Sequence, residues 1–166
     1  IALITEQLNA VMKPEKLKEY ADLLRKMGAD IVFENGNFTA YPSRLRGTSI
    51  DASDIPDLVP ILSVAASVAD GETVIYNASR LSLKESDRIE SVCSTLLSLG
   101  ACIRATEDGM MIRGKERLEG GKVDSFNDHR IAMSSAVASL VCDGAVTVSR
   151  FEAINKSYPY LLCLFY

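Results

Sequence analysis

The sequence lacks the features that mark zinc proteins and nucleic-acid-binding proteins. Its four cysteines form no Cys-x-x-Cys pair, and a single histidine is present, so the usual zinc ligand spacings are missing. Acidic residues outnumber basic residues by 22 to 18, whereas proteins that bind a phosphate backbone usually carry a basic surplus. We therefore expect reduced, mostly buried thiols, no zinc site and no nucleic acid among the partners.

The sequence also lacks an apolar run long enough to cross a membrane. The longest such runs, residues 58–69 and 131–142, fall short of the roughly 20 residues that a spanning helix needs. No charged-then-apolar signal segment opens the chain. These absences, with 48% hydrophobic residues over 166 positions, predict one cytosolic globular domain that buries its own core and does not contact membranes.

Local patterns predict an alternation of helices and strands. Apolar residues at helical spacing predict a helix over residues 14–27, and Gly28 is placed to end it. Asn35-Gly36 between two apolar runs predicts a hairpin over residues 30–41. Further elements are expected as a strand at 1–5, a strand near 46–51, a buried helix over 58–69 and a strand at 72–76. The first residue is Ile1 and the expected first strand starts there, which indicates that the sequence begins inside a longer polypeptide.

The sequence repeats with a period of about 72 residues. The patterns that recur are Leu-Leu followed by Gly-Ala at 23–29 and 96–101, a hairpin tip at 35–36 and 108–109, and Asp-Gly before a strand at 70–71 and 143–144. At the same offset Lys84 falls on Lys156, and Asp57 falls on the run 127–130. If rotation relates the repeats, these charged loops converge on one end of the domain; simple duplication with unrelated loop charges is the alternative.

A charged cluster, Lys84-Glu85-Ser86-Asp87-Arg88, stands where a strand-like run gives way to a helical one. A helix N-terminus with a Lys and an Arg beside it suits a phosphate or carboxylate. The Glu would repel such a ligand unless it carries or moves a proton, which is the work of a general acid–base. The alternative is an ordinary helix start that Ser86 or Asp87 caps, with solvated charges.

Four motifs in order resemble the signatures of one enzyme family, the EPSP synthases. They are Asp54-Ile55-Pro56-Asp57, the cluster 84–88, Asn127-Asp128-His129-Arg130-Ile131-Ala132-Met133 and Lys156-Ser157-Tyr158-Pro159. The resemblance covers the whole chain but only the C-terminal lobe of that two-lobed enzyme, so the N-terminal lobe is absent. It implies an α+β lobe of repeated βαβαββ units in a pseudo-threefold arrangement, with apolar helices bundled inside and sheets outside. The pseudo-repeats would span about 12–83 and 84–155, with a further unit or closing helix starting at 156–166.

The resemblance also implies the chemistry. The family transfers the enolpyruvyl group of phosphoenolpyruvate to the 5-hydroxyl of shikimate-3-phosphate through a tetrahedral intermediate and releases phosphate, in aromatic amino acid biosynthesis. It uses no metal and no organic cofactor, and the full-length enzyme is expected to be a cytoplasmic monomer. By resemblance Asp57 is the base or orienter at the hydroxyl, Lys84 a proton carrier or electrostatic partner, and Glu85 the proton donor to carbon. Arg88, Arg130 and Lys156 would clamp phosphoenolpyruvate, the arginines through bidentate forks.

The role of His129 is open, and we favour support of the pocket wall over direct catalysis. Two other functions are considered. UDP-N-acetylglucosamine enolpyruvyl transferase shares this architecture and chemistry, although the motifs favour the shikimate enzyme. A non-catalytic anion-binding or assembly module could also retain the scaffold.

Overall fold

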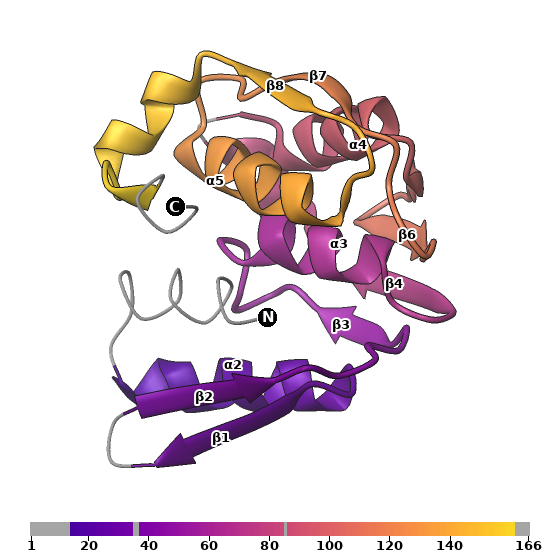
Figure 1. Cartoon of the computed structure of the whole chain (residues 1–166), viewed down its shortest axis with the longest axis vertical. Coiled ribbons are helices and arrows are strands. Elements are labelled where there is room, and N and C mark those ends of the chain that lie inside the picture. Colours follow the sequence, from indigo (N-terminus) through magenta and orange to yellow (C-terminus); the bar gives the residue numbers. More distant parts are fainter. Residues whose placement is uncertain (1–13, 35–36, 85, 162–166) are drawn as a thin grey trace.

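The order of elements in a computed structural model repeats itself along the chain. The structure describes residues 14–34, 37–84 and 86–161, so the expected strand at 1–5 lies outside the described residues. Helix α2 (Pro14–Lys26) is followed by strands β1 (Asp30–Glu34), β2 (Asn37–Tyr41) and β3 (Ser49–Asp51), helix α3 (Val59–Ser67) and strand β4 (Glu72–Tyr76). Helix α4 (Arg88–Ser98) starts the same series again, with β5 (Cys102–Ala105), β6 (Met110–Arg113), β7 (Gly121–Asp124), α5 (His129–Ala138) and β8 (Val146–Ser149) (Figure 1).

The two helices that start the series end in the same way. Gly28 after α2 and Gly100 after α4 have φ angles of 89° and 85°, which residues with a side chain rarely adopt. Each glycine therefore closes its helix and turns the chain into a hairpin. The hairpin predicted over residues 30–41 is confirmed, because β1 and β2 pair antiparallel with Glu34 opposite Asn37.

A four-stranded sheet with the order β3-β4-β6-β5 is formed by consecutive elements. Strands β3 and β4 are parallel with α3 as the crossover between them, and the antiparallel hairpin β5–β6 adds to the other edge of β4. One complete βαβαββ unit therefore runs from β3 to β6. Strands β7 and β8 form a second parallel pair, and α5 is the crossover between them, as α3 is between β3 and β4.

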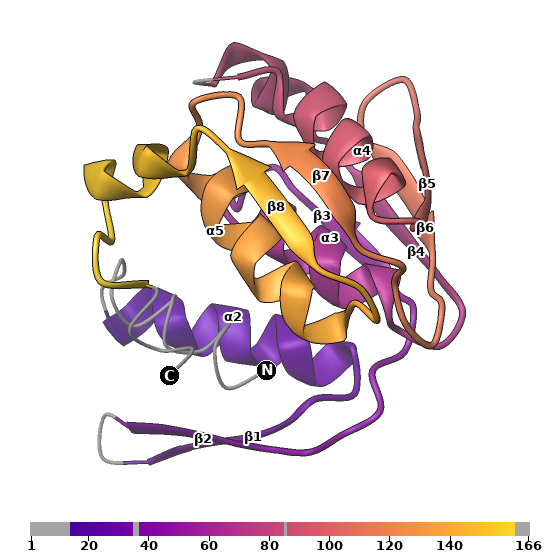
Figure 2. The ribbon, with the colours of Figure 1, turned by 45° about the horizontal axis from the view of Figure 1, so that its top comes forward.

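Helices α3 and α5 form the core of the molecule. All nine residues of α3 are buried, and Arg130 is the one residue of α5 that is not. Their buried serines donate to backbone carbonyls one turn earlier, for example Ser63 to Val59 and Ser135 to Ile131, so burial leaves these hydroxyls satisfied. The helices α3, α4 and α5 pack against one another, and the β7–β8 pair crosses in front of α5 and α3 (Figure 2).

Several sequence-based expectations need adjustment. The strand near 46–51 is limited to β3, and Arg46 joins Asp70 only in an isolated bridge. Gly47, between Arg46 and β3, passes so close to Glu72 that an added Cβ would lie 2.2 Å from its carbonyl oxygen. The strand-like run before Lys84 is instead a 3₁₀ helix, η1 (Ser79–Leu83), and another, η3 (Phe151–Lys156), stands 72 residues later. Of the cysteines, Cys93 and Cys142 are buried and Cys102 is exposed, while Cys163 lies outside the described residues.

No helix within residues 14–34, 37–84 and 86–161 combines the length and apolar character that crossing a bilayer requires.

Candidate functional site

Three helix N-termini meet at Asp57. This residue lies in the turn that enters α3, Arg88 is the first residue of α4, and Arg130 lies in the first turn of α5. The contacts that join them span 31 residues from Asp57 to Arg88 and 73 from Asp57 to Arg130. Because each N-terminus carries a partial positive charge, their meeting point favours anions.

The Asp57 carboxylate is shared among three cations. Its Oδ1 lies 2.6 Å from Nη1 of Arg88 and 3.5 Å from Nζ of Lys84, and its Oδ2 lies 3.0 Å from Nη2 of Arg130. Partial burial raises the pKa of Asp57, but the Arg88 hydrogen bond and the charges of Arg130, Arg88 and Lys84 outweigh it, so the pKa lies below its ordinary value. Asp57 is therefore ionised at neutral pH while these cations surround it.

A second carboxylate, Asp128, holds Arg88 from the other side. Nε of Arg88 donates to Oδ2 of Asp128 at 2.8 Å, and the side chains of both residues are buried. Burial raises the pKa of Asp128, but hydrogen bonds from Arg88, the Arg130 backbone N–H and Ser86, with the charge of Arg88, bring it below its ordinary value. Asp128 is also the N-cap of α5, since its Oδ1 accepts from the Arg130 N–H at 2.9 Å.

Two further predicted site residues, Lys156 and His129, lie next to this cluster. Nζ of Lys156, at the end of η3, donates to the carbonyl of Asn127 at 3.0 Å, which places it beside the α5 motif. His129 is largely buried at the start of α5, with Nδ1 4.0 Å from Oδ1 of Asp128, too long for a hydrogen bond between them. Glu85 lies outside the described residues.

The charges of this cluster suit an anionic ligand. Lys84, Arg88 and Arg130 converge on Asp57, and Lys156 lies beside the α5 motif, so four cations lie in or next to the cluster. The guanidinium forks of the two arginines match phosphate or carboxylate oxygens in pairs. Within the described ranges no group of three or more His, Cys, Asp or Glu side chains is placed to hold a metal ion.

Asp128 and Ser86 were not predicted as site residues by sequence reasoning, although both stand inside recognised motifs. Ser86 Oγ donates to Oδ2 of Asp128 at 3.2 Å, so these two residues join the α4 and α5 motifs. An Asp before a helix is the ordinary cap residue. That local pattern carries no sign that the same carboxylate also pairs with an arginine 40 residues earlier.

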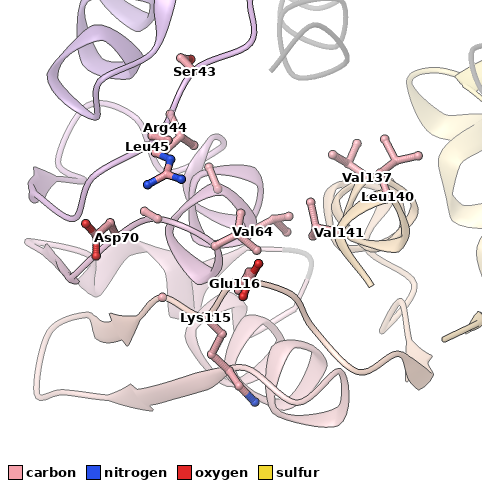
Figure 3. A pocket seen from close by; sticks show the side chains of 14 residues that line it. Ser43, Arg44, Leu45, Val64, Asp70, Lys115, Glu116, Val137, Leu140 and Val141 are labelled. Atoms are coloured by element: carbon pink, nitrogen blue, oxygen red, sulfur yellow. The ribbon is translucent and has the colours of Figure 1, made fainter. Parts of the chain in front are cut away.

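A cavity of about 740 Å³ lies elsewhere, at the C-terminal ends of α3 and α5. Val64 of α3, Val137 of α5 and Val141, which follows α5, line it together with Arg44 and Glu116 (Figure 3). The charged cluster stands at the opposite ends of these helices. The cavity is therefore separate from the candidate site.

Acid is expected to destabilise the chain through this cluster. Because the pKa values of Asp57 and Asp128 are lower in the folded state than their ordinary value of 3.8, their contribution is fully present above that value and is lost as the pH falls through the folded values. The urea midpoint should therefore fall as the pH is lowered from pH 4 to pH 2, and less steeply in Asp128→Asn. A midpoint of the wild type that stays constant over this range would contradict the assignment.

The sequence is similar to proteins of one family over most of its length. Residues 5–162 match the family model described as EPSP synthase (3-phosphoshikimate 1-carboxyvinyltransferase). The 3-phosphoshikimate 1-carboxyvinyltransferase of Clostridium acetobutylicum is 49% identical over 142 residues, and that of Clostridium novyi is 47% identical over 142 residues. Each match covers 86% of this chain and 33% of the relative.

The fold has a close counterpart among solved structures. A structure of EPSP synthase from Acinetobacter baumannii aligns with a TM-score of 0.76 and 33% sequence identity, over 87% of this chain and 37% of that chain. The chain thus spans about a third of the length of the curated relatives that it matches.

Proposed function

Since the chain belongs to the EPSP synthase (3-phosphoshikimate 1-carboxyvinyltransferase) family, we propose that it forms part of an enzyme that transfers the enolpyruvyl group of phosphoenolpyruvate to the 5-hydroxyl of shikimate-3-phosphate. The observation that carries this proposal is the convergence of Lys84, Arg88 and Arg130 on Asp57. Two anionic substrates and a hydroxyl that must lose a proton need cations and a carboxylate in one place.

In the proposed reaction Asp57 takes the proton of the shikimate hydroxyl or orients it as the oxygen bonds to carbon 2 of phosphoenolpyruvate. Glu85 gives a proton to the methylene carbon, and Lys84 carries a proton or stabilises charge between the substrates. The C–O bond to phosphate then breaks, phosphate leaves with the bonding electrons, and Glu85, now a carboxylate, takes a proton from the methyl group to restore the double bond. Arg88, Arg130 and Lys156 hold phosphoenolpyruvate throughout, and His129 supports the wall beside them.

The proposed place of the chain is the C-terminal lobe of a cytoplasmic enzyme that is a monomer at full length. An N-terminal lobe would supply the other half of the site. Isolated β-bridges at Arg46–Asp70 and Leu118–Cys142 recur 72 residues apart, which supports pseudo-repeats at about 12–83 and 84–155. The pseudo-threefold arrangement, with a third unit or closing helix from 156–166, is part of the same proposal.

A phosphate-release assay on the full-length protein, this chain joined to its N-terminal lobe, tests the function. Phosphoenolpyruvate is offered with shikimate-3-phosphate or UDP-N-acetylglucosamine, and release should require shikimate-3-phosphate. Release only with the nucleotide sugar would identify the related transferase. Binding of phosphoenolpyruvate without release to either acceptor would indicate a non-catalytic anion-binding module.

Replacing Glu85 by Gln in the full-length protein separates proton transfer from binding. The amide keeps the shape and hydrogen-bonding capacity of the side chain but has no transferable proton. We expect kcat to fall by about a hundredfold, with much less change in phosphoenolpyruvate affinity. Glu90→Gln, an exposed position in the first turn of α4, is the matched control. Near-normal kcat with poor affinity would show that Glu85 organises the site electrostatically.

A further inference from the structure

The buried pair of Arg88 and Asp128 needs an explanation beyond stability. The side chains of Arg88 and Asp128 are 1% and 0% exposed. A buried ion pair is a weak source of net stability, because the desolvation of both charges offsets their attraction. A fixed geometry for Arg88 is a better reason for such a pair at a site that binds anions.

Asp57 and Asp128, the carboxylates that contact Arg88 in the described part of the chain, differ in their access to solvent. Asp57 contacts Nη1 at 2.6 Å and its side chain is 44% exposed, whereas Asp128 contacts Nε at 2.8 Å and is fully enclosed. Asp57 is therefore the carboxylate that an anion arriving from solvent could replace on the guanidinium. Asp128 cannot be reached in this way, so its bond to Nε persists and keeps the plane of the guanidinium fixed.

The loop that delivers Asp128 is held in an uncommon conformation. Phe126 and Asn127 have φ angles of 54° and 56°, a region that a Phe rarely adopts. Ser125 stabilises the loop, since its Oγ accepts from the Asn127 N–H at 3.1 Å and donates to the Arg150 carbonyl at 2.9 Å. Lys156 adds its bond to the Asn127 carbonyl. The surrounding contacts thus maintain a strained turn that ends at the buried carboxylate.

Asp128 also fixes both anion-binding motifs to each other. Its Oδ2 accepts from Ser86 in the α4 motif as well as from Arg88, and its Oδ1 accepts from the Arg130 backbone in the α5 motif. One carboxylate therefore sets the position of Arg88 relative to Arg130. A fork formed by two arginines can bind one ligand well only if that relative position is correct.

We propose that Asp128 is a positioning residue that holds Arg88 for the anionic substrate while Asp57 is displaced from it. This inference rests on the proposed function, in which phosphoenolpyruvate is the anion. Asp128 itself does not contact the substrate and acts through Arg88. Its removal should consequently affect the affinity for phosphoenolpyruvate rather than that for shikimate-3-phosphate.

The test uses Asp128→Asn in the full-length protein, with phosphoenolpyruvate binding measured by calorimetry without the second substrate and both KM values measured kinetically. Asparagine keeps the size of the side chain and an acceptor for the Arg130 N–H but removes the charge that holds Arg88. We expect phosphoenolpyruvate to bind about 10- to 100-fold more weakly, the range for a hydrogen bond to a charged group. The KM for shikimate-3-phosphate should change less than about threefold on the same scale.

Two further variants make the result specific. Asp143→Asn removes an exposed carboxylate that pairs with Arg117 after the far end of α5, and should leave both KM values unchanged. In an Arg88→Ala background, Asp128→Asn should weaken phosphoenolpyruvate binding by less than about threefold, because residues that act through one partner are not additive. If Asp128→Asn weakened phosphoenolpyruvate binding in that background as much as it does in the wild type, the proposal would be overturned.

A melting curve and a second variant, Asp128→Ser, distinguish loss of positioning from a folding defect. Serine keeps a side-chain cap for α5 but is too short to hydrogen-bond Arg88. Asp128→Ser should reproduce the selective loss of phosphoenolpyruvate affinity. Equal loss of affinity for both substrates, together with a lower melting temperature, would show a merely structural role. The binding measurement does not require turnover, so the proposal is judged separately from the activity: no transfer by the wild type would overturn the proposed function alone.

Discussion

The 166-residue chain, purified by itself, is expected to fold and to release no measurable phosphate from phosphoenolpyruvate. Its buried helices α3 and α5 and its four-stranded sheet form a core without any other chain. The proposed reaction, however, also uses groups from a second lobe. Bringing two substrates together and excluding water accounts for much of the rate enhancement of an enzyme, and closure of a second lobe is the proposed source of both.

Circular dichroism and a coupled phosphate assay with both substrates would check this expectation. The full-length protein is the positive control under the same conditions. The difference should exceed that of any single substitution, because positioning by the second lobe is lost entirely and not for one group. Turnover by the isolated chain would contradict the two-lobe proposal.

Replacing Asp57 by Asn in the full-length protein should lower kcat by roughly a hundredfold to ten-thousandfold, the range for loss of a general base. Phosphoenolpyruvate should bind equally well or more tightly. The reason is that the Asp57 carboxylate pairs with Lys84, Arg88 and Arg130 in the free site, whereas an uncharged amide competes less strongly with an anion for these cations. A fall in kcat without a loss of phosphoenolpyruvate affinity would identify Asp57 as a base that also occupies the anion site when the ligand is absent.

The matched control is Asp54→Asn, an exposed residue of the same turn, which should have near-normal kcat and KM. Steady-state phosphate release gives kcat, and calorimetry gives affinity. If Asp57→Asn instead retained turnover but lost phosphoenolpyruvate binding, Asp57 would be an organiser of the arginines and not the base.

Elements whose signals are local were predictable from the sequence. The apolar spacing before Gly28 predicted α2, the largely apolar run 58–69 predicted a buried α3, and Asp108-Gly109 marked the hairpin of β5 and β6. Helical periodicity and turn chemistry depend on neighbouring residues, so one stretch of chain contains the whole signal. Local composition also misled in one place. The run before Lys84 resembles a strand by composition, but it forms the 3₁₀ helix η1.

The sequence by itself determined which charged groups are available and that they stand at helix starts, and the motifs containing Asp57, Lys84, Arg88 and Arg130 were visible in it. Only the tertiary structure decided how these charges pair. The packing of α3, α4 and α5 places Arg88 between Asp57 and Asp128, and it buries one of these carboxylates while the other stays open to solvent. Burial and pairing depend on contacts between residues 31 to 73 positions apart, which no local pattern encodes.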